Sequence, residues 1–198
     1  MELTATSKIK NLQQAGIGYM VAGLGMLSMG IPYWFMGKDT EDVLANHWEY
    51  GIFQIIDNFI ESLFGSLGYV LASMGMLLGA YSLMQIGEPV AFNKRKLFWI
   101  PIIASICHIL SLKILVPFAP LGSFLYALSF TIIGIISIKA KIWTGWKRYT
   151  PLFIGLFPFV MMYPLLVITG NPPHHIIPLW GLAFFLLGLS AWVRAKEI

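Results

Sequence analysis

The segment LGSFLYALSFTIIGIISIKAK, residues 121–141, decides the fold class of this chain. It runs from Leu121 to Ile138 without a charged side chain and ends in a basic turn. A helix that spans a bilayer needs about 20 mostly apolar residues. The sequence contains five further apolar segments, so we predict an all-α polytopic membrane protein. Its six transmembrane helices form a single domain, residues 1–198, with spans at about 15–36, 60–86, 97–116, 121–138, 151–169 and 176–193.

The composition supports the membrane class. Hydrophobic residues make up 58% of the chain, charged residues make up 11%, and the mean hydropathy is +0.76. Soluble domains carry about a quarter charged residues, which they need to cover their surface. The net charge of +4 lies in short loops, so we expect a lipid bilayer and no nucleic acid as partner. The single cysteine, Cys107, excludes an intrachain disulfide.

The distribution of basic residues predicts the orientation. Cytoplasmic loops of membrane proteins carry an excess of Lys and Arg. With six spans, only Lys38 and Lys113 fall on the side opposite the termini. The other basic residues of the loops share the side of both termini: Lys8, Lys10, Lys94, Arg95, Lys96, Lys139, Lys141, Lys147, Arg148, Arg194 and Lys196. We therefore predict that both termini are cytoplasmic, and we expect a bacterial plasma membrane.

Two segments resemble each other: GYMVAGLGML begins at Gly18, and GYVLASMGML begins at Gly68. Small residues recur in both, and helices in lipid associate by close backbone approach at such residues. Both segments therefore carry small-residue surfaces that are suited to close helix packing. Convergent packing and an internal duplication both explain the resemblance.

Prolines interrupt the fifth predicted span at Pro158 and Pro164, and a PFAP turn, residues 117–120, separates the third span from the fourth. Proline removes a backbone donor and kinks a helix. Broken helices line cavities in transporters, although prolines are also common in membrane helices generally. The kink therefore has a functional and a purely structural interpretation.

A polar stripe precedes the second span. Gln54, Asp57, Asn58 and Glu61 follow one another at helical spacing, so they share one face of a helix. One interpretation is an amphipathic interfacial extension on the outward side, with its carboxylates in water. The other is the outer end of the second span, with its carboxylates facing a cavity.

Four further polar residues complete the predicted site. Ionisable groups at membrane depth need a partner or water, and His108 and Lys113 in the third span are candidate partners for Glu61. Such a pair either holds two helices together or binds a ligand or proton. His174 and His175 lie in the last outward loop, where they are interfacial, metal-binding or pH-sensing residues. No HExxH, phosphate loop or haem-type histidine pair is present, so we expect no metal or cofactor.

These features leave three functional hypotheses. The first is a protein that binds or transports a small cationic or zwitterionic solute in an outward polar cavity, with the possibility of proton coupling. Its ligand-binding residues would be Gln54, Asp57, Asn58, Glu61, His108, Lys113, His174 and His175. The second is a structural or regulatory subunit whose basic cytoplasmic loops dock a protein partner. The third is an acid–base enzyme acting on a lipid. We favour the first and expect no catalytic residues.

Overall fold

The structure, a computed structural model, describes residues 5–35, 67–86, 95–111 and 118–198. Helices and their connecting turns account for these residues, and no strand occurs among them. The all-helical prediction is therefore confirmed for the described part of the chain. The helices are α1 (Ala5–Met29), α2 (Ile31–Phe35), α5 (Leu67–Ile86), α6 (Trp99–Ser111), α7 (Phe118–Ala140), α8 (Thr150–Phe157), α9 (Tyr163–Thr169) and α10 (Trp180–Ala195).

Short 3-10 turns precede three of these helices, and a π-helical turn joins two others. Arg95–Phe98 leads into α6, Gly145–Tyr149 into α8, and Ile177–Leu179 into α10, each as a 3-10 turn. The π-helical turn Pro158–Met162 joins α8 to α9, so these two helices form one continuous pass through the bundle.

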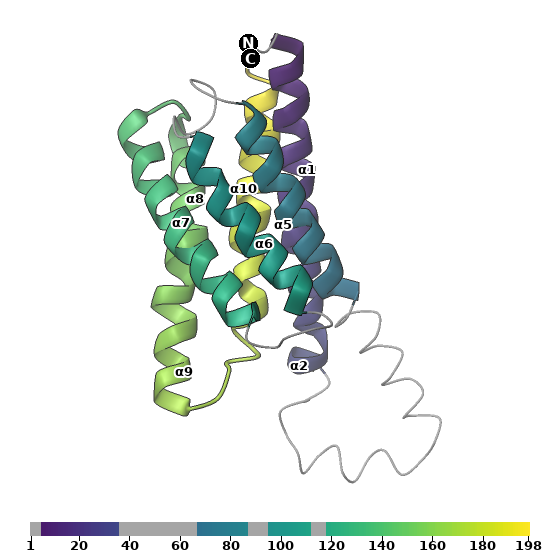
Figure 1. Ribbon diagram of the computed structural model, residues 1–198, viewed down its shortest axis with the longest axis vertical. Helices are drawn as coiled ribbons and strands as arrows, with labels where there is room; N and C mark the ends of the chain where they lie inside the picture. The colour runs from purple at the N-terminus through teal and green to yellow at the C-terminus, as the bar shows by residue number, and fades with distance from the viewer. Residues whose placement is uncertain (1–4, 36–66, 87–94, 112–117) are drawn as a thin grey trace.

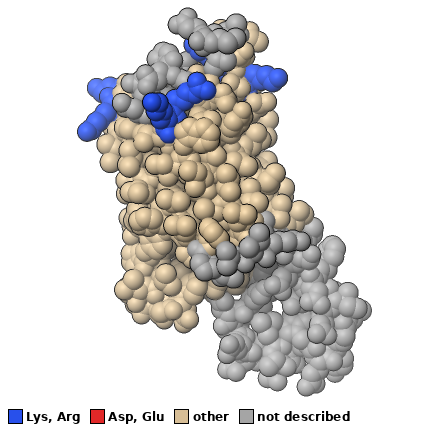
Figure 2. Space-filling view, in the orientation of Figure 1, with Lys and Arg blue, Asp and Glu red and all other residues tan. Residues whose placement is uncertain are grey.

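The helices pack side by side as a bundle (Figure 1). The long helix α1 packs extensively against α5 and α10, and α7 packs against α6 and α8. Both termini lie at the same end of the bundle (Figure 1). The Lys and Arg side chains visible in Figure 2 gather at this end too, while the opposite half of the described surface in view shows none.

Four of the described helices are long and apolar enough to cross a membrane: Leu67–Ile86, Phe118–Ala140, Gly145–Thr169 and Ile177–Ala195. The helix α1 has 25 residues, which corresponds to a length of about 37 Å. Its glycines and the pair Gln13 and Gln14 make it less apolar than these four. For α6, the structure describes 13 residues.

Two boundaries differ from the prediction. The helix α1 begins at Ala5 instead of residue 15, because the polar segment before Ala15 contains no helix breaker. The helix α7 begins at Phe118, so Pro120 lies in its first turn and not in a connecting turn. Proline is tolerated there because the first turn needs no backbone donor. The predicted amphipathic extension before the second span lies outside the described residues.

Glycines set the close contact between α1 and α5. A Cβ atom at Gly75 would lie 2.5 Å from the carbonyl oxygen of Gly18, and a Cβ at Gly25 would lie 2.6 Å from that of Gly68. Gly18 and Gly25 occupy the positions in the first repeat that Gly68 and Gly75 occupy in the second. The two repeats therefore pack against each other with local two-fold symmetry. This geometry fits both convergent packing and duplication.

An ion pair links the C-terminal residues to the 3-10 turn that precedes α8. Lys147 is buried, and its ammonium group donates a hydrogen bond to Glu197. Arg194 donates a second one to the other carboxylate oxygen, at 3.3 Å. The hydrogen bond from Lys147 is the main cause that lowers the pKa of Glu197 below 4.5. Glu197 thus provides the counter-charge for a buried lysine.

This pair predicts a pH dependence of stability. Because the pKa of Glu197 is lower in the folded than in the unfolded chain, the pair stabilises the fold above about pH 4.5. That stabilisation is lost as the pH falls through the folded pKa. We expect Glu197→Gln to lower the melting temperature slightly at neutral pH, and we expect this difference to shrink as the pH falls below about 4.5. Melting curves of both proteins across this range measure the difference, and a difference that is independent of pH would contradict the assignment.

Candidate functional site

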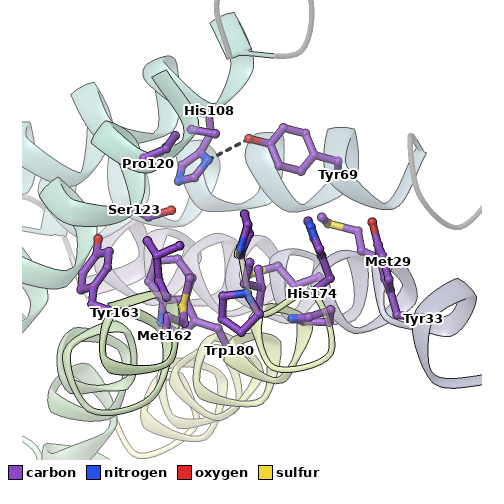
Figure 3. A pocket seen from close by; sticks show the side chains of 17 residues that line it. Met29, Tyr33, Tyr69, His108, Pro120, Ser123, Met162, Tyr163, His174 and Trp180 are labelled. Atoms are coloured by element: carbon purple, nitrogen blue, oxygen red, sulfur yellow. Dashed lines mark hydrogen bonds between the residues drawn. The ribbon is translucent and has the colours of Figure 1, made fainter. Parts of the chain in front are cut away.

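A cavity of about 380 Å³ lies at the end of the bundle opposite the termini. It is bounded by the helix ends on that side and by the loop between α9 and α10 (Figure 3). Its walls are mainly methionine, proline and aromatic side chains. The lining residues are Met26, Met29, Tyr33, Tyr69, His108, Ala119, Pro120, Ser123, Met162, Tyr163, Leu166, Pro172, Pro173, His174, Ile177, Pro178 and Trp180.

A hydrogen-bonded cluster joins α5 and α6 at the cavity wall. Tyr69 lies in the first turn of α5, and His108 and Ser111 lie one turn apart on the last turns of α6. The hydroxyl oxygen of Tyr69 is 3.0 Å from Nδ1 of His108 and 2.8 Å from Oγ of Ser111. Ser111 also donates to the carbonyl oxygen of His108, at 2.7 Å. These contacts hold the imidazole of His108 in one orientation.

The opposite edge of the imidazole packs against α7. A Cβ at Gly122 would lie 3.0 Å from Nε2 of His108, so glycine is needed for this close approach. The side chain of His108 points from α6 toward Ser123, which also lines the cavity (Figure 3). Within the part of the chain that the structure describes, the buried Nε2 atom has no hydrogen-bond partner.

Aromatic contacts close one end of the cavity. The ring of Tyr33 stacks on His174, with 5.0 Å between ring centroids and 7° between planes. The indole nitrogen of Trp34 donates to the carbonyl oxygen of His175, at 2.8 Å. The loop between α9 and α10 is thereby fastened to α2.

The π-helical turn shapes another wall. The backbone nitrogen of Tyr163 donates to the carbonyl oxygen of Pro158, five residues earlier, instead of forming an α-helical bond. The two prolines of this pass, Pro158 and Pro164, each lack a backbone donor, which favours such an irregular turn. The turn places Met162 and Tyr163 on the cavity wall. Single π-turns occur often at functional sites, which supports the functional interpretation of the kink.

Of the residues predicted for the site, the structure brings His108 and His174 to one cavity. His175 is exposed and contributes its backbone oxygen to the loop contact instead of lining the cavity. The remaining predicted residues, Gln54, Asp57, Asn58, Glu61 and Lys113, lie outside the described residues. The predicted contacts of Glu61 with His108 or Lys113 therefore stay predictions. Within the described ranges, no group of three His, Cys, Asp or Glu residues is arranged to hold a metal ion.

Sequence reasoning missed most of the polar cavity wall. Tyr69, Ser123 and Tyr163 were not selected because a hydroxyl group in an apolar helix carries no spacing signal of its own. The position of Tyr69 in the repeated GY motif, next to a packing glycine, was the one available clue. Trp180 is fully buried and donates its indole N–H to the carbonyl oxygen of Ile154, at 2.9 Å.

The described walls have the character of a small-molecule binding site. An apolar cavity of a few hundred cubic ångströms with a small number of fixed polar groups is typical of a small-molecule site. The partner of His108 at Nδ1 is a tyrosine and not a carboxylate. Comparisons with known protein families, with curated proteins and with solved structures found no match.

Proposed function

We propose that this chain is a multi-pass plasma-membrane protein that binds or transports a small solute in the cavity opposite its termini. The observation that carries this proposal is the cavity of about 380 Å³, which lies between the helices and is walled by apolar side chains and a few fixed polar groups. Pockets of about 300–1,000 Å³ with this character bury most of the surface of a small ligand.

The gathering of basic residues supports an orientation in the membrane. Lys and Arg side chains lie at the end of the bundle that carries both termini (Figure 2). Under the positive-inside rule this end is cytoplasmic. In the proposed orientation six helices span the bilayer, and the cavity belongs to the outward half.

The preference for a cationic or zwitterionic solute is a separate part of the proposal. It rests on the two carboxylates of the polar stripe, Asp57 and Glu61, which precede Leu67 in the sequence. Carboxylates at the entrance of a cavity raise the local concentration of cations. The described walls contribute no acidic side chain, so they would contact the apolar part of the solute.

A cavity-filling substitution tests the binding function. We expect Ser123→Trp to weaken the binding of small solutes at least tenfold, because the indole would occupy the space between α6, α7 and α10. The measurement is ¹⁹F NMR titration of fluorinated alkyl and aryl fragments, with neutral, ammonium and carboxylate members, into protein in lipid nanodiscs.

The matched control is Leu121→Trp on the same helix. Leu121 is exposed on the outside of α7 and does not line the cavity. This variant is expected to bind the fragments with unchanged affinity. If the two tryptophan variants behave alike, or if no fragment binds the unmodified protein saturably, the proposed function is wrong.

A further inference from the structure

The proton positions in the cluster around His108 follow from its three contacts. A carbonyl oxygen only accepts, so the single hydroxyl proton of Ser111 is directed to the carbonyl oxygen of His108. Tyr69 must then donate its own proton to Oγ of Ser111. The remaining contact is satisfied only if Nδ1 of His108 donates to the oxygen of Tyr69. We therefore assign His108 as the tautomer that carries its proton on Nδ1.

This assignment determines the chemistry of the other ring nitrogen. In a neutral imidazole with a proton on Nδ1, Nε2 carries a lone pair and accepts hydrogen bonds. The side chain of His108 is 5% exposed, and no other described residue donates to Nε2. A buried acceptor without a hydrogen-bond donor costs free energy. Most buried acceptors in proteins are therefore paired with a donor from the protein or from ordered water. Nε2 is itself covered at the cavity wall, so a bound molecule would reach this fixed acceptor by a small shift of the neighbouring wall at Gly122.

The remaining surface of the cavity restricts the rest of the ligand. Met29, Met162 and Trp180 are apolar over most of their surface, and sulfur-containing and aromatic side chains adapt well to flat rings. An anion would bring lone pairs against the lone pair of Nε2, which is repulsive. A molecule with an N–H or O–H group would instead form a hydrogen bond.

We infer that the cavity takes an amphipathic molecule with an apolar, ring-sized body and an N–H or O–H group that donates to Nε2 of His108. This inference rests on the proposed function, because it names the class of ligand for the same cavity. An ammonium group is one such donor, and its positive charge would also be attracted by the carboxylates of the polar stripe.

A pair of probes that differ in one atom tests the donor. 5-Fluoroindole and 5-fluorobenzofuran have nearly the same shape, but the first has an N–H group where the second has an ether oxygen. We expect the protein in nanodiscs to bind 5-fluoroindole about fivefold more tightly in ¹⁹F NMR titrations, the size expected for one neutral hydrogen bond. Binding of both probes should be lost in Ser123→Trp and retained in Leu121→Trp.

Two substitutions at His108 separate its two ring nitrogens. The amide of asparagine reaches the position of Nδ1 and keeps a donor for Tyr69, whereas it leaves no acceptor at the position of Nε2. The longer glutamine places its amide oxygen near the position of Nε2. We expect His108→Asn to bind both probes with equal affinity and His108→Gln to retain the preference for 5-fluoroindole.

A measurement on the unmodified protein covers the case in which these variants fail to fold. In protein labelled with ¹⁵N-histidine, we expect one ring that is protonated at Nδ1 and unprotonated at Nε2, whose Nε2 signal shifts on addition of 5-fluoroindole. A proton on Nε2 in the ligand-free protein would overturn the inference.

The titrations have equally definite outcomes. Equal affinity for the two probes, a preference that survives in His108→Asn, or no saturable binding of 5-fluoroindole would each overturn the inference. Binding that is blocked by Ser123→Trp but shows no donor preference overturns only the inference and leaves the proposed function standing. The two claims therefore fail separately.

Discussion

Replacement of Tyr126 by alanine is expected to lower the free energy of unfolding by about 3 kcal/mol. The side chain is fully buried, and its ring stacks on Phe130, with 5.4 Å between centroids. It also meets the edges of Trp180 and Phe184 from α10. Its hydroxyl group donates to the carbonyl oxygen of Met76 in α5, at 3.1 Å. Because the hydroxyl oxygen also lies 3.0 Å from Oγ of Ser105 in α6, this one side chain links α7 to α5, α6 and α10, and its removal leaves a cavity between them.

Two further variants separate the ring from the hydroxyl group. Tyr126→Phe retains the aromatic contacts and loses the hydroxyl contacts with Met76 and Ser105, so it should cost about 1 kcal/mol. Leu128→Ala removes an exposed side chain from the same helix and should have little effect. Reversible unfolding in mixed detergent micelles, followed by circular dichroism, measures all three. Equal losses for Tyr126→Ala and Leu128→Ala would show that the aromatic cluster does not hold the bundle together.

Substitution of Gly75 by leucine is expected to cost at least about 3 kcal/mol, because it forces α1 and α5 apart. A Cβ at this position would lie 2.5 Å from the carbonyl oxygen of Gly18 and 2.6 Å from the backbone nitrogen of Ala22. Both are backbone atoms, which cannot rotate away as a flexible side chain would. Van der Waals contact at small residues is the main source of helix association in lipid, so the loss affects the whole α1–α5 interface.

The adjacent residue provides the control for this substitution. Met74 is exposed on the other side of α5, and Met74→Leu should leave stability unchanged. Gly75→Ala should fall between the two, because a methyl group needs a smaller shift of α1. The same micelle assay applies to all three variants. If Gly75→Leu is as stable as Met74→Leu, the close glycine contact does not exist in the folded protein.

The candidate site was predictable in part. His108 was identified because a histidine inside an apolar helix needs a partner, and the structure supplies Tyr69 as that partner. Tyrosine was not a candidate because it is uncharged and fits an apolar helix without any partner. His174 was identified from its place in the last outward loop, but its stacking on Tyr33 depends on a loop path that no local pattern encodes.

The helical class and the polarity of the bundle were determined by the sequence alone. Long apolar segments form helices in lipid because every backbone donor must be satisfied within the segment. The basic residues also follow a simple order along the chain, and those visible on the described surface in Figure 2 gather at the end that carries both termini. Both properties are sums over many residues, so they do not depend on the details of packing.

Only the tertiary structure decided which groups meet in the cavity. The register between α5 and α6 places Tyr69 beside His108, and that register follows from contacts with α1 and α7 at Gly68 and Gly122. A shift of one residue on a helix rotates a side chain by about 100°, which would separate these groups completely. Such a register is set by shape complementarity between helices distant in the sequence, and therefore no single segment contains it.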